Sequence, residues 1–168
     1  MIYFDNAATT RAADEVAEKV KHMLLENFGN PSSQSMMGVN AEKEMNEARK
    51  IMAQSINALP EEIYFTSGGT EDDNWAIFGT AEGYIRSGKH MITTSIEHPA
   101  VLMPMRHLEE KGWDITVLDV DESGYIDIEK LKAAVREDTV LVSTILINNE
   151  TGTIQNAAEI SKAIKSVN

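Results

Sequence analysis

The sequence contains no cysteine among its 168 residues. The chain therefore cannot by itself supply a disulfide, a thiolate metal ligand or a thiol nucleophile. It also lacks any apolar run that approaches the length of a membrane span. The first residues, 1–5, lack the basic segment of a signal peptide, so we expect a cytoplasmic protein.

Basic residues are also few. Lysine and arginine number 15 against 27 aspartates and glutamates, which gives a formal net charge of -12. A balance this acidic argues against binding to nucleic acid or to an anionic membrane surface. It does not exclude a phosphate ligand, because a helix N-terminus binds anions locally. Hydrophobic residues make up 42% of the chain and charged residues 25%, which is ordinary for a soluble globular protein with a core.

Strand-like and helix-like segments alternate along the chain. Runs of apolar, aromatic and β-branched residues predict strands, and apolar residues at helical spacing predict helices. The predicted strands are 62–66, 90–94, 113–120 and 139–146. The predicted helices are 13–27, 40–59, 72–86, 99–111, 127–136 and a last one from Asn156 or Ala157. This alternation predicts an α/β fold with a mainly parallel sheet and flanking helices.

Some local expectations are more specific. The nearly continuous apolar run 139–146 is typical of a parallel strand buried on both faces. Pro104 falls inside the helix 99–111, so we expect a late start or a kink, because an interior proline costs about 3 kcal/mol. The loop that begins at Phe28 is expected to run on to Gly38. The histidines that belong to no motif are expected to be solvated: His22, His90 and His107.

The segment 64–71 joins a predicted strand to a predicted helix through Gly68 and Gly69. The unpaired N–H groups and the positive end of the helix dipole make such a turn an anion site. The glycines let the backbone approach a ligand, and Ser67 and Thr70 could add hydroxyl donors. The plainer interpretation is a β–α turn with a serine or threonine as N-cap. Local sequence alone leaves both interpretations open.

Three polar loops each follow a predicted strand: 67–71, 95–98 and 148–153. Ligands of parallel α/β sheets bind at the carboxyl ends of the strands. We therefore expect these loops to lie together on one rim of the sheet.

Five pieces of the chain, taken in order and spacing, resemble the N-terminal part of a cysteine desulfurase of the NifS/IscS type. The pieces are 3–10, 28–33, 65–71, 93–101 and 148–154. Such enzymes are class V, fold-type-I enzymes that depend on pyridoxal phosphate (PLP). The resemblance covers essentially the whole chain. It implies the N-terminal half of a PLP-transferase-like large domain, with an N-terminal arm over 1–14 and the incomplete PLP-binding domain over 15–168.

The resemblance also implies roles for four residues around the cofactor. Gly69 and Thr70 match the phosphate cup. His98 matches the imidazole that stacks on the pyridine ring and helps to move protons, which makes it the expected catalytic residue; without the family it would be a helix-capping histidine. Asn149 matches the residue that hydrogen-bonds the phenolic oxygen of the cofactor, and is otherwise a turn asparagine.

The N-terminal segment Asn6, Ala7 and Ala8 resembles the part that approaches the substrate pocket, where the family substrate is L-cysteine. Without the family it would be a plain loop. The resemblance implies no metal site. One departure is Ser35, which stands where the family pattern usually carries a histidine, and it puts a local pocket contact in doubt.

The family residues that do most of the chemistry lie beyond the matched part. These are the Asp that pairs with the pyridine nitrogen, the Schiff-base Lys, the nucleophilic Cys and the Arg that holds the substrate carboxylate. PLP acts as an electron sink only with its lysine and its pyridinium partner. None of the lysines of this chain lies in a matching motif. We therefore expect this chain alone to be inactive and to bind PLP weakly or not at all.

Three functions stay open. The first is the N-terminal portion of a cysteine desulfurase, which turns L-cysteine into alanine and an enzyme persulfide for iron–sulfur cluster or thio-cofactor assembly. The second is a non-catalytic, truncated relative that serves as a binding or assembly module. The third is another class V enzyme, such as a selenocysteine lyase or an aminotransferase. The motif 148–152 favours the first.

We also expect a partner. In the fold that the chain resembles, the strand matching 62–66 lies at the far side of the sheet, and its neighbour comes from sequence beyond Asn168. The strand 139–145 would then have an open edge, which invites pairing with another chain. The expected partner is a complementary C-terminal chain or a second copy, unless 62–66 pairs directly with 139–145.

Overall fold

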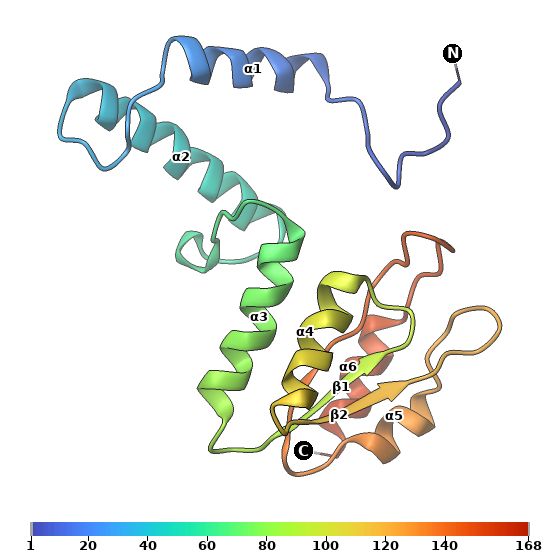
Figure 1. Cartoon of the computed structure of the whole chain (residues 1–168). Coiled ribbons are helices and arrows are strands. Elements are labelled where there is room, and N and C mark those ends of the chain that lie inside the picture. Colours follow the sequence, from blue (N-terminus) through green and yellow to red (C-terminus); the bar gives the residue numbers. More distant parts are fainter. Residues whose placement is uncertain (1, 168) are drawn as a thin grey trace. The chain divides into compact units, whose positions relative to one another are not determined.

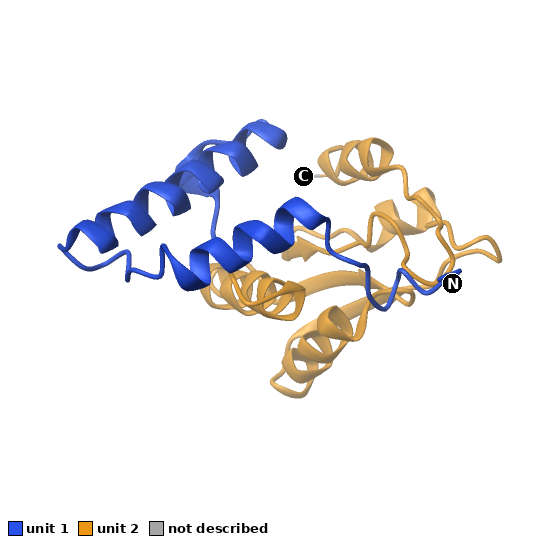
Figure 2. Ribbon diagram, turned by 90° about the horizontal axis from the view of Figure 1, so that it is seen from above, with its two compact units in different colours: residues 1–65 blue, residues 66–168 orange. Residues whose placement is uncertain are grey.

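The computed structural model describes residues 2–167. The chain forms two compact units whose boundary falls between Phe65 and Thr66 (Figure 2). This boundary reflects contacts within the present chain. The predicted arm 1–14 and domain 15–168 refer to a larger fold, and they stay a prediction.

The first unit is helical. It contains α1 (Asp14–Leu25), α2 (Met36–Ser55) and the short 3-10 helix η1 (Pro60–Glu62) (Figure 1). An ion pair between Lys19 and Glu44 links α1 to α2. No residue of α1 is fully buried, and Met23 is half-buried where it lines a hollow with residues of α2.

Helix α2 begins earlier than the predicted start at Asn40, and the predicted loop does not reach Gly38. Ser35 is the N-cap, and its hydroxyl accepts a 3.2 Å hydrogen bond from the backbone N–H of Gly38. A Cβ at Gly38 would lie 2.2 Å from the carbonyl oxygen of Ser33, so the close approach of this turn requires glycine. The local cap therefore decides where the helix starts.

The predicted strand 62–66 is wrong. Ile63 has extended backbone angles, φ -98° and ψ 124°, but no described residue pairs with this segment as a strand. Arg49 holds it instead: the guanidinium donates to the carbonyl of Ile63 and lies 5.0 Å from the ring centre of Phe65. A strand needs a neighbouring backbone, and residues 2–167 supply none here.

The second unit alternates helices and strands, as predicted. Its elements are α3 (Gly69–Tyr84), β1 (His90–Thr94), α4 (Pro99–Glu110), β2 (Asp114–Leu118), α5 (Ile128–Ala134), β3 (Thr139–Val142) and α6 (Ala157–Lys165) (Figure 1). The three strands are parallel and lie in the order β2-β1-β3. The α/β class with a parallel sheet and flanking helices is thus confirmed.

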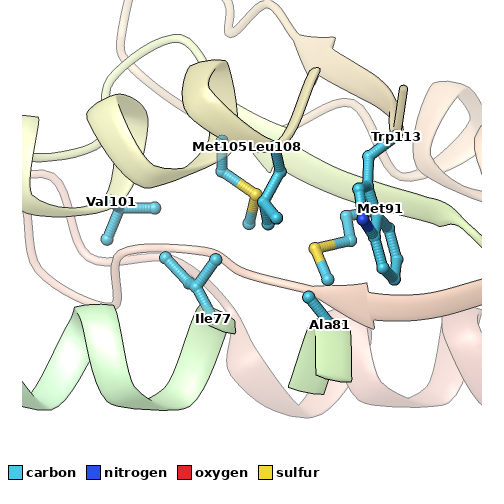
Figure 3. Close-up of a cluster of buried hydrophobic side chains, with 7 residues drawn as sticks. All are labelled: Ile77, Ala81, Met91, Val101, Met105, Leu108 and Trp113. Atoms are coloured by element: carbon cyan, nitrogen blue, oxygen red, sulfur yellow. The ribbon is translucent and has the colours of Figure 1, made fainter. Parts of the chain in front are cut away.

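Strand β1 is the centre of the sheet, and all five of its residues are buried. Successive side chains of a strand point to opposite faces, so Met91 and Ile92 enter two separate cores. Met91 packs with residues of α3 and α4, whose side chains point toward one another in Figure 3. Ile92 packs with residues of β2, α5 and α6.

Strand β3 does not have the complete burial that the apolar run 139–146 predicts. Its four residues, Thr139–Val142, are only half-buried. The reason is its position, because among the described residues β3 pairs with β1 alone and has an open outer edge. The continuous apolar run therefore indicates a strand whose open side a further polypeptide segment could bury.

Helix α4 begins at Pro99, so the late start expected from Pro104 is wrong. Proline has no N–H to offer the carbonyl of Ala100 one turn earlier. The side-chain amide of Asn74 in α3 donates to that carbonyl at 3.4 Å, and to the carbonyl of Thr70 at 2.8 Å. A side chain from the neighbouring helix thus supplies the missing donor.

His90 is fully buried, and the expectation that it is solvated is wrong. Its ring lies between the hydroxyls of Thr116 and Thr139, with Nε2 at 2.8 Å from the first and Nδ1 at 2.7 Å from the second. The central position of β1 buries its first residue, and polar neighbours on both flanking strands satisfy the imidazole. The other two, His22 and His107, are exposed as expected.

Candidate functional site

The N-terminus of α3 is open to a ligand. Gly68 is the N-cap, at φ 156°, so neither Ser67 nor Thr70 has the capping position. Among residues 2–167, the backbone N–H groups of Gly69 and Thr70 and the hydroxyl of Thr70 have no hydrogen-bond partner. A Cβ added at Gly69 would meet no atom within 4 Å. The turn therefore presents donors and free space at the positive end of a helix.

Ser67 is not one of these free donors. Its backbone N–H and its hydroxyl both donate to Oε2 of Glu71, at 2.8 and 2.7 Å. These two hydrogen bonds from Ser67 lower the pKa of the Glu71 carboxyl. Within the first turn of α3, the donors that remain free among the described residues are those of Gly69 and Thr70.

His98 is the N-cap of α4, as its plainer interpretation predicts. Its Nδ1 accepts a 3.1 Å hydrogen bond from the backbone N–H of Ala100. Since Nδ1 is the acceptor, the neutral ring carries its proton on Nε2. The residue is exposed, so the cap orients the imidazole and leaves it accessible to a ligand.

Asn149 is exposed, and its side-chain amide donates to Glu150 at 2.9 Å. The preceding Asn148 is 6% exposed and holds the turn. Its Oδ1 accepts from the backbone N–H groups of Glu150 and Thr151, each at 2.9 Å. Its Nδ2 donates to the carbonyl of Ile96, at 2.9 Å. The loops 95–98 and 148–153 are thus in contact.

A second link between these loops comes from Glu97, which is 8% exposed. Its Oε1 accepts from the hydroxyl of Thr94 at 2.9 Å and from the backbone N–H of Ile145. Burial raises the pKa of the Glu97 carboxyl, and the two donors oppose that effect. The two donors satisfy Oε1 of this buried side chain, as a buried polar group requires.

Thr70 and His98 line a shallow hollow of about 440 Å³ that lies between α3 and α4 and extends as far as Phe78 and His107. Asn74, which bridges the two helices, lines it as well. Asn149 does not line it, but its loop is joined to the His98 segment through Asn148 and Ile96. The loop 95–98 thus lies next to the loop 148–153 and shares a hollow with Thr70. The loop 67–71 follows no strand among the described residues, so its place on a rim of the sheet stays a prediction.

The substrate-pocket residues Asn6, Ala7 and Ala8 belong to the first unit, where they are exposed. They form part of a turn in which the N–H of Ala8 donates to the carbonyl of Asp5 at 3.2 Å. Their predicted approach to the substrate stays a prediction.

Sequence reasoning missed three residues that organise this region: Asn74, Glu97 and Asn148. Asn148 had a detectable signal, because an asparagine before short polar residues is typical of a turn that it closes with its own side chain. Asn74 and Glu97 gave no signal for their contacts with Ala100 and Ile145, because these partners lie 26 and 48 residues away in the chain. No group of three His, Asp or Glu side chains within residues 2–167 could hold a metal ion. Nor is any helix in this part of the chain long and apolar enough to cross a membrane.

Comparison with known proteins identifies the family of this chain. The family model of the class-V aminotransferases matches residues 2–168. The cysteine desulfurase IscS of Neisseria gonorrhoeae is 51% identical over 162 residues, which are 96% of this chain and 40% of that protein. The cysteine desulfurase IscS of Methanosarcina thermophila is 48% identical, over 98% of this chain and 41% of its own length.

Solved structures agree as well. A NifS-like protein superposes with a TM-score of 0.97 at 41% identity, over 99% of this chain and 46% of that one. SspA in complex with cysteine superposes with a TM-score of 0.92 at 37% identity, over 98% of this chain and 47% of that one. The chain thus spans about 40% of the length of the curated relatives named above, and corresponds to their N-terminal portion. It belongs to the class-V aminotransferase family, as a homologue of part of the cysteine desulfurase IscS.

Proposed function

We propose that this chain is the N-terminal portion of a PLP-dependent cysteine desulfurase and supplies one wall of its cofactor pocket. The observation that carries the proposal is the open N-terminus of α3. The free N–H groups of Gly69 and Thr70 lie at the turn whose Thr70 shares a hollow with His98. A phosphate is the anion that such a helix terminus suits.

The residues present suit PLP in three ways. Gly69 and Thr70 would hold the phosphate with backbone N–H groups and a hydroxyl, in the space above Gly69. His98 would lie on the pyridine ring, with its orientation set by the bond to Ala100. The amide of Asn149 would donate to the phenolic oxygen, after release from Glu150. Bound PLP supplies an electron sink for bonds at the α-carbon of an amino acid.

The proposed reaction needs groups that this chain does not contain, and a partner must supply them. It holds no cysteine, so a persulfide must form on a thiol from elsewhere. We propose that the lysine, the thiol and the pyridinium partner come from a polypeptide equivalent to the rest of the relatives' length, with L-cysteine as the substrate. The half-buried β3, with its open outer edge, is where strand pairing with such a polypeptide would continue the sheet. A cytoplasmic setting is part of this proposal.

Complementation tests the proposal. The 168-residue chain is mixed with the separately purified C-terminal portion of the Neisseria gonorrhoeae relative, and PLP and L-cysteine are added. The expected result is PLP absorbance and cysteine-dependent release of sulfide and alanine by the mixture, with neither piece active alone. Cysteine-dependent sulfide release by the isolated chain, with one stoichiometric lysine adduct after borohydride reduction, would contradict the proposal that the lysine and the thiol come from a second polypeptide.

A matched pair of variants tests the phosphate cup. Thr70→Val removes the free hydroxyl at the N-terminus of α3, and Thr80→Val makes the same change farther along that helix. In the complemented mixture we expect Thr70→Val to weaken PLP binding about tenfold, because a hydrogen bond to a charged group contributes about 1.5–3 kcal/mol. Inorganic phosphate should compete with PLP. Equal affinities for the two variants would argue against the cup.

A further inference from the structure

We propose that Glu97 and Asn148 are positioning residues that hold the His98 segment and the Asn149 segment together at the end of the sheet. The proposal rests on the proposed function for the roles of His98 and Asn149. The contacts themselves are independent of that function.

The main-chain pairing of β1 with β3 ends before the residues of interest. The last backbone bond between the two segments runs from the N–H of Ser143 to the carbonyl of Ile92, at 2.9 Å. Beyond this point the chain must deliver His98 on one side and Asn149 on the other without a strand ladder. Something else must keep the two segments in register.

Two side chains do so, one from each segment. Glu97 follows β1, and it accepts from the backbone N–H of Ile145 in the segment after β3. Asn148 follows β3, and it donates 2.9 Å to the backbone carbonyl of Ile96 in the segment after β1. Each side chain thus takes the place of a ladder bond. The pair is reciprocal, and each member is next to one residue of the proposed site.

The side chains of Glu97 and Asn148 are both buried, and both make further hydrogen bonds within their own segments. Glu97 is 8% exposed and also accepts from Thr94, the last residue of β1. Asn148 is 6% exposed, and its Oδ1 closes the turn that carries Asn149. Burial raises the pKa of the Glu97 carboxyl, and the negative charge of Asp73 raises it further, while Ile145 and Thr94 lower it. A buried acid at this place is unfavourable unless its acceptor atoms are used.

The test uses the isotopically labelled 168-residue chain with the variants Glu97→Ala and Glu97→Gln. Gln keeps the Oε1 that accepts both hydrogen bonds, and Ala removes it. Glu109→Ala, on the exposed part of α4, is the control. Amide exchange of Ile145 and Ile92 reports on the clamp and on the core. The ring resonances of His98 and the side-chain amide of Asn149 report on the two proposed contacts.

We expect Glu97→Ala to speed exchange at Ile145 about tenfold more than at Ile92, because an amide without its partner is left exposed. The His98 and Asn149 resonances should shift, and Glu97→Gln should restore all three signals. In the complemented mixture, Glu97→Ala should weaken PLP binding while Glu97→Gln retains it.

Equal acceleration at Ile145 and Ile92 in Glu97→Ala would overturn the proposal, since that is the result of a general loss of stability. Unchanged His98 and Asn149 resonances would overturn it too. If Glu97→Ala does not fold, Asn148→Asp removes the donor to Ile96 and keeps the turn acceptor, and the same resonances must shift. If these signals respond as expected while no mixture binds PLP, the proposed function fails and the positioning role stands.

Discussion

Nδ1 of His90 lies 2.7 Å from the hydroxyl oxygen of Thr139, and Nε2 lies 2.8 Å from that of Thr116. The Thr139 oxygen also accepts the backbone N–H of Arg136, at 2.8 Å. The neutral imidazole offers one donor and one acceptor to the two hydroxyls. The charged ring would instead place two donors and a positive charge in this buried position.

Stability should therefore fall as the pH drops below about 6.5, the usual pKa of histidine. Burial, and next the positive charge of Arg136, lower the pKa of His90, although Asp114 and Asp138 oppose them. The unfolded chain then binds more protons than the folded one, so the free energy of unfolding decreases on acidification, by at most about 1.4 kcal/mol per pH unit. Urea unfolding between pH 7.5 and 5 measures it. His90→Gln should remove this slope, and the exposed control His107→Gln should keep it.

Two neighbouring buried threonines should respond in opposite ways to valine. Among the described residues, the hydroxyl of Thr93 is buried without a partner, whereas that of Thr94 donates to Glu97. We expect Thr93→Val to be neutral or to stabilise by up to about 1 kcal/mol, and Thr94→Val to destabilise by about 1–3 kcal/mol. Urea denaturation of both variants checks this, and a larger loss for Thr93→Val would contradict it.

The two adjacent asparagines should differ as well. Asn148→Ala leaves a turn and the carbonyl of Ile96 without their partners, and we expect it to destabilise by about 1–3 kcal/mol. Asn149 is exposed, and among the described residues its side chain hydrogen-bonds Glu150 alone, so Asn149→Ala should change stability by less than about 0.5 kcal/mol. Thermal and urea unfolding provide the comparison. Equal losses would mean that the turn does not depend on Asn148.

The isolated chain should self-associate when no complementary polypeptide is present. The edge of β3 is open among the described residues, and the segment after it exposes Leu146 and Ile147 by 53% and 54%. An open apolar edge invites strand pairing. Sedimentation at low micromolar concentration should show species heavier than the 18.6 kDa monomer. A compact monomer that unfolds cooperatively would instead show that the chain covers this edge by itself.

Local patterns in the sequence were enough for most helices and for the sheet class. Asp127 begins the predicted helix 127–136, and it is the N-cap of α5, where its carboxylate accepts from the N–H groups of Glu129 and Lys130. Asn156 caps the last helix in the same way. These signals act over three or four residues, so they can be read from the sequence alone. The five family-like pieces likewise identified the family that the chain belongs to.

Tertiary structure decided everything that depends on distant partners. The segment 62–66 has the composition of a strand but no neighbour to pair with in the described chain, so it is irregular. His90 belongs to no motif and was expected to be solvated, but the central position of β1 in the sheet buries it. The role of Glu97 depends on the hydrogen bond that it accepts from the backbone N–H of Ile145, 48 residues later in the chain. Strand pairing, burial and long-range hydrogen bonds are properties of the assembled sheet, because they arise only when segments far apart in the sequence meet.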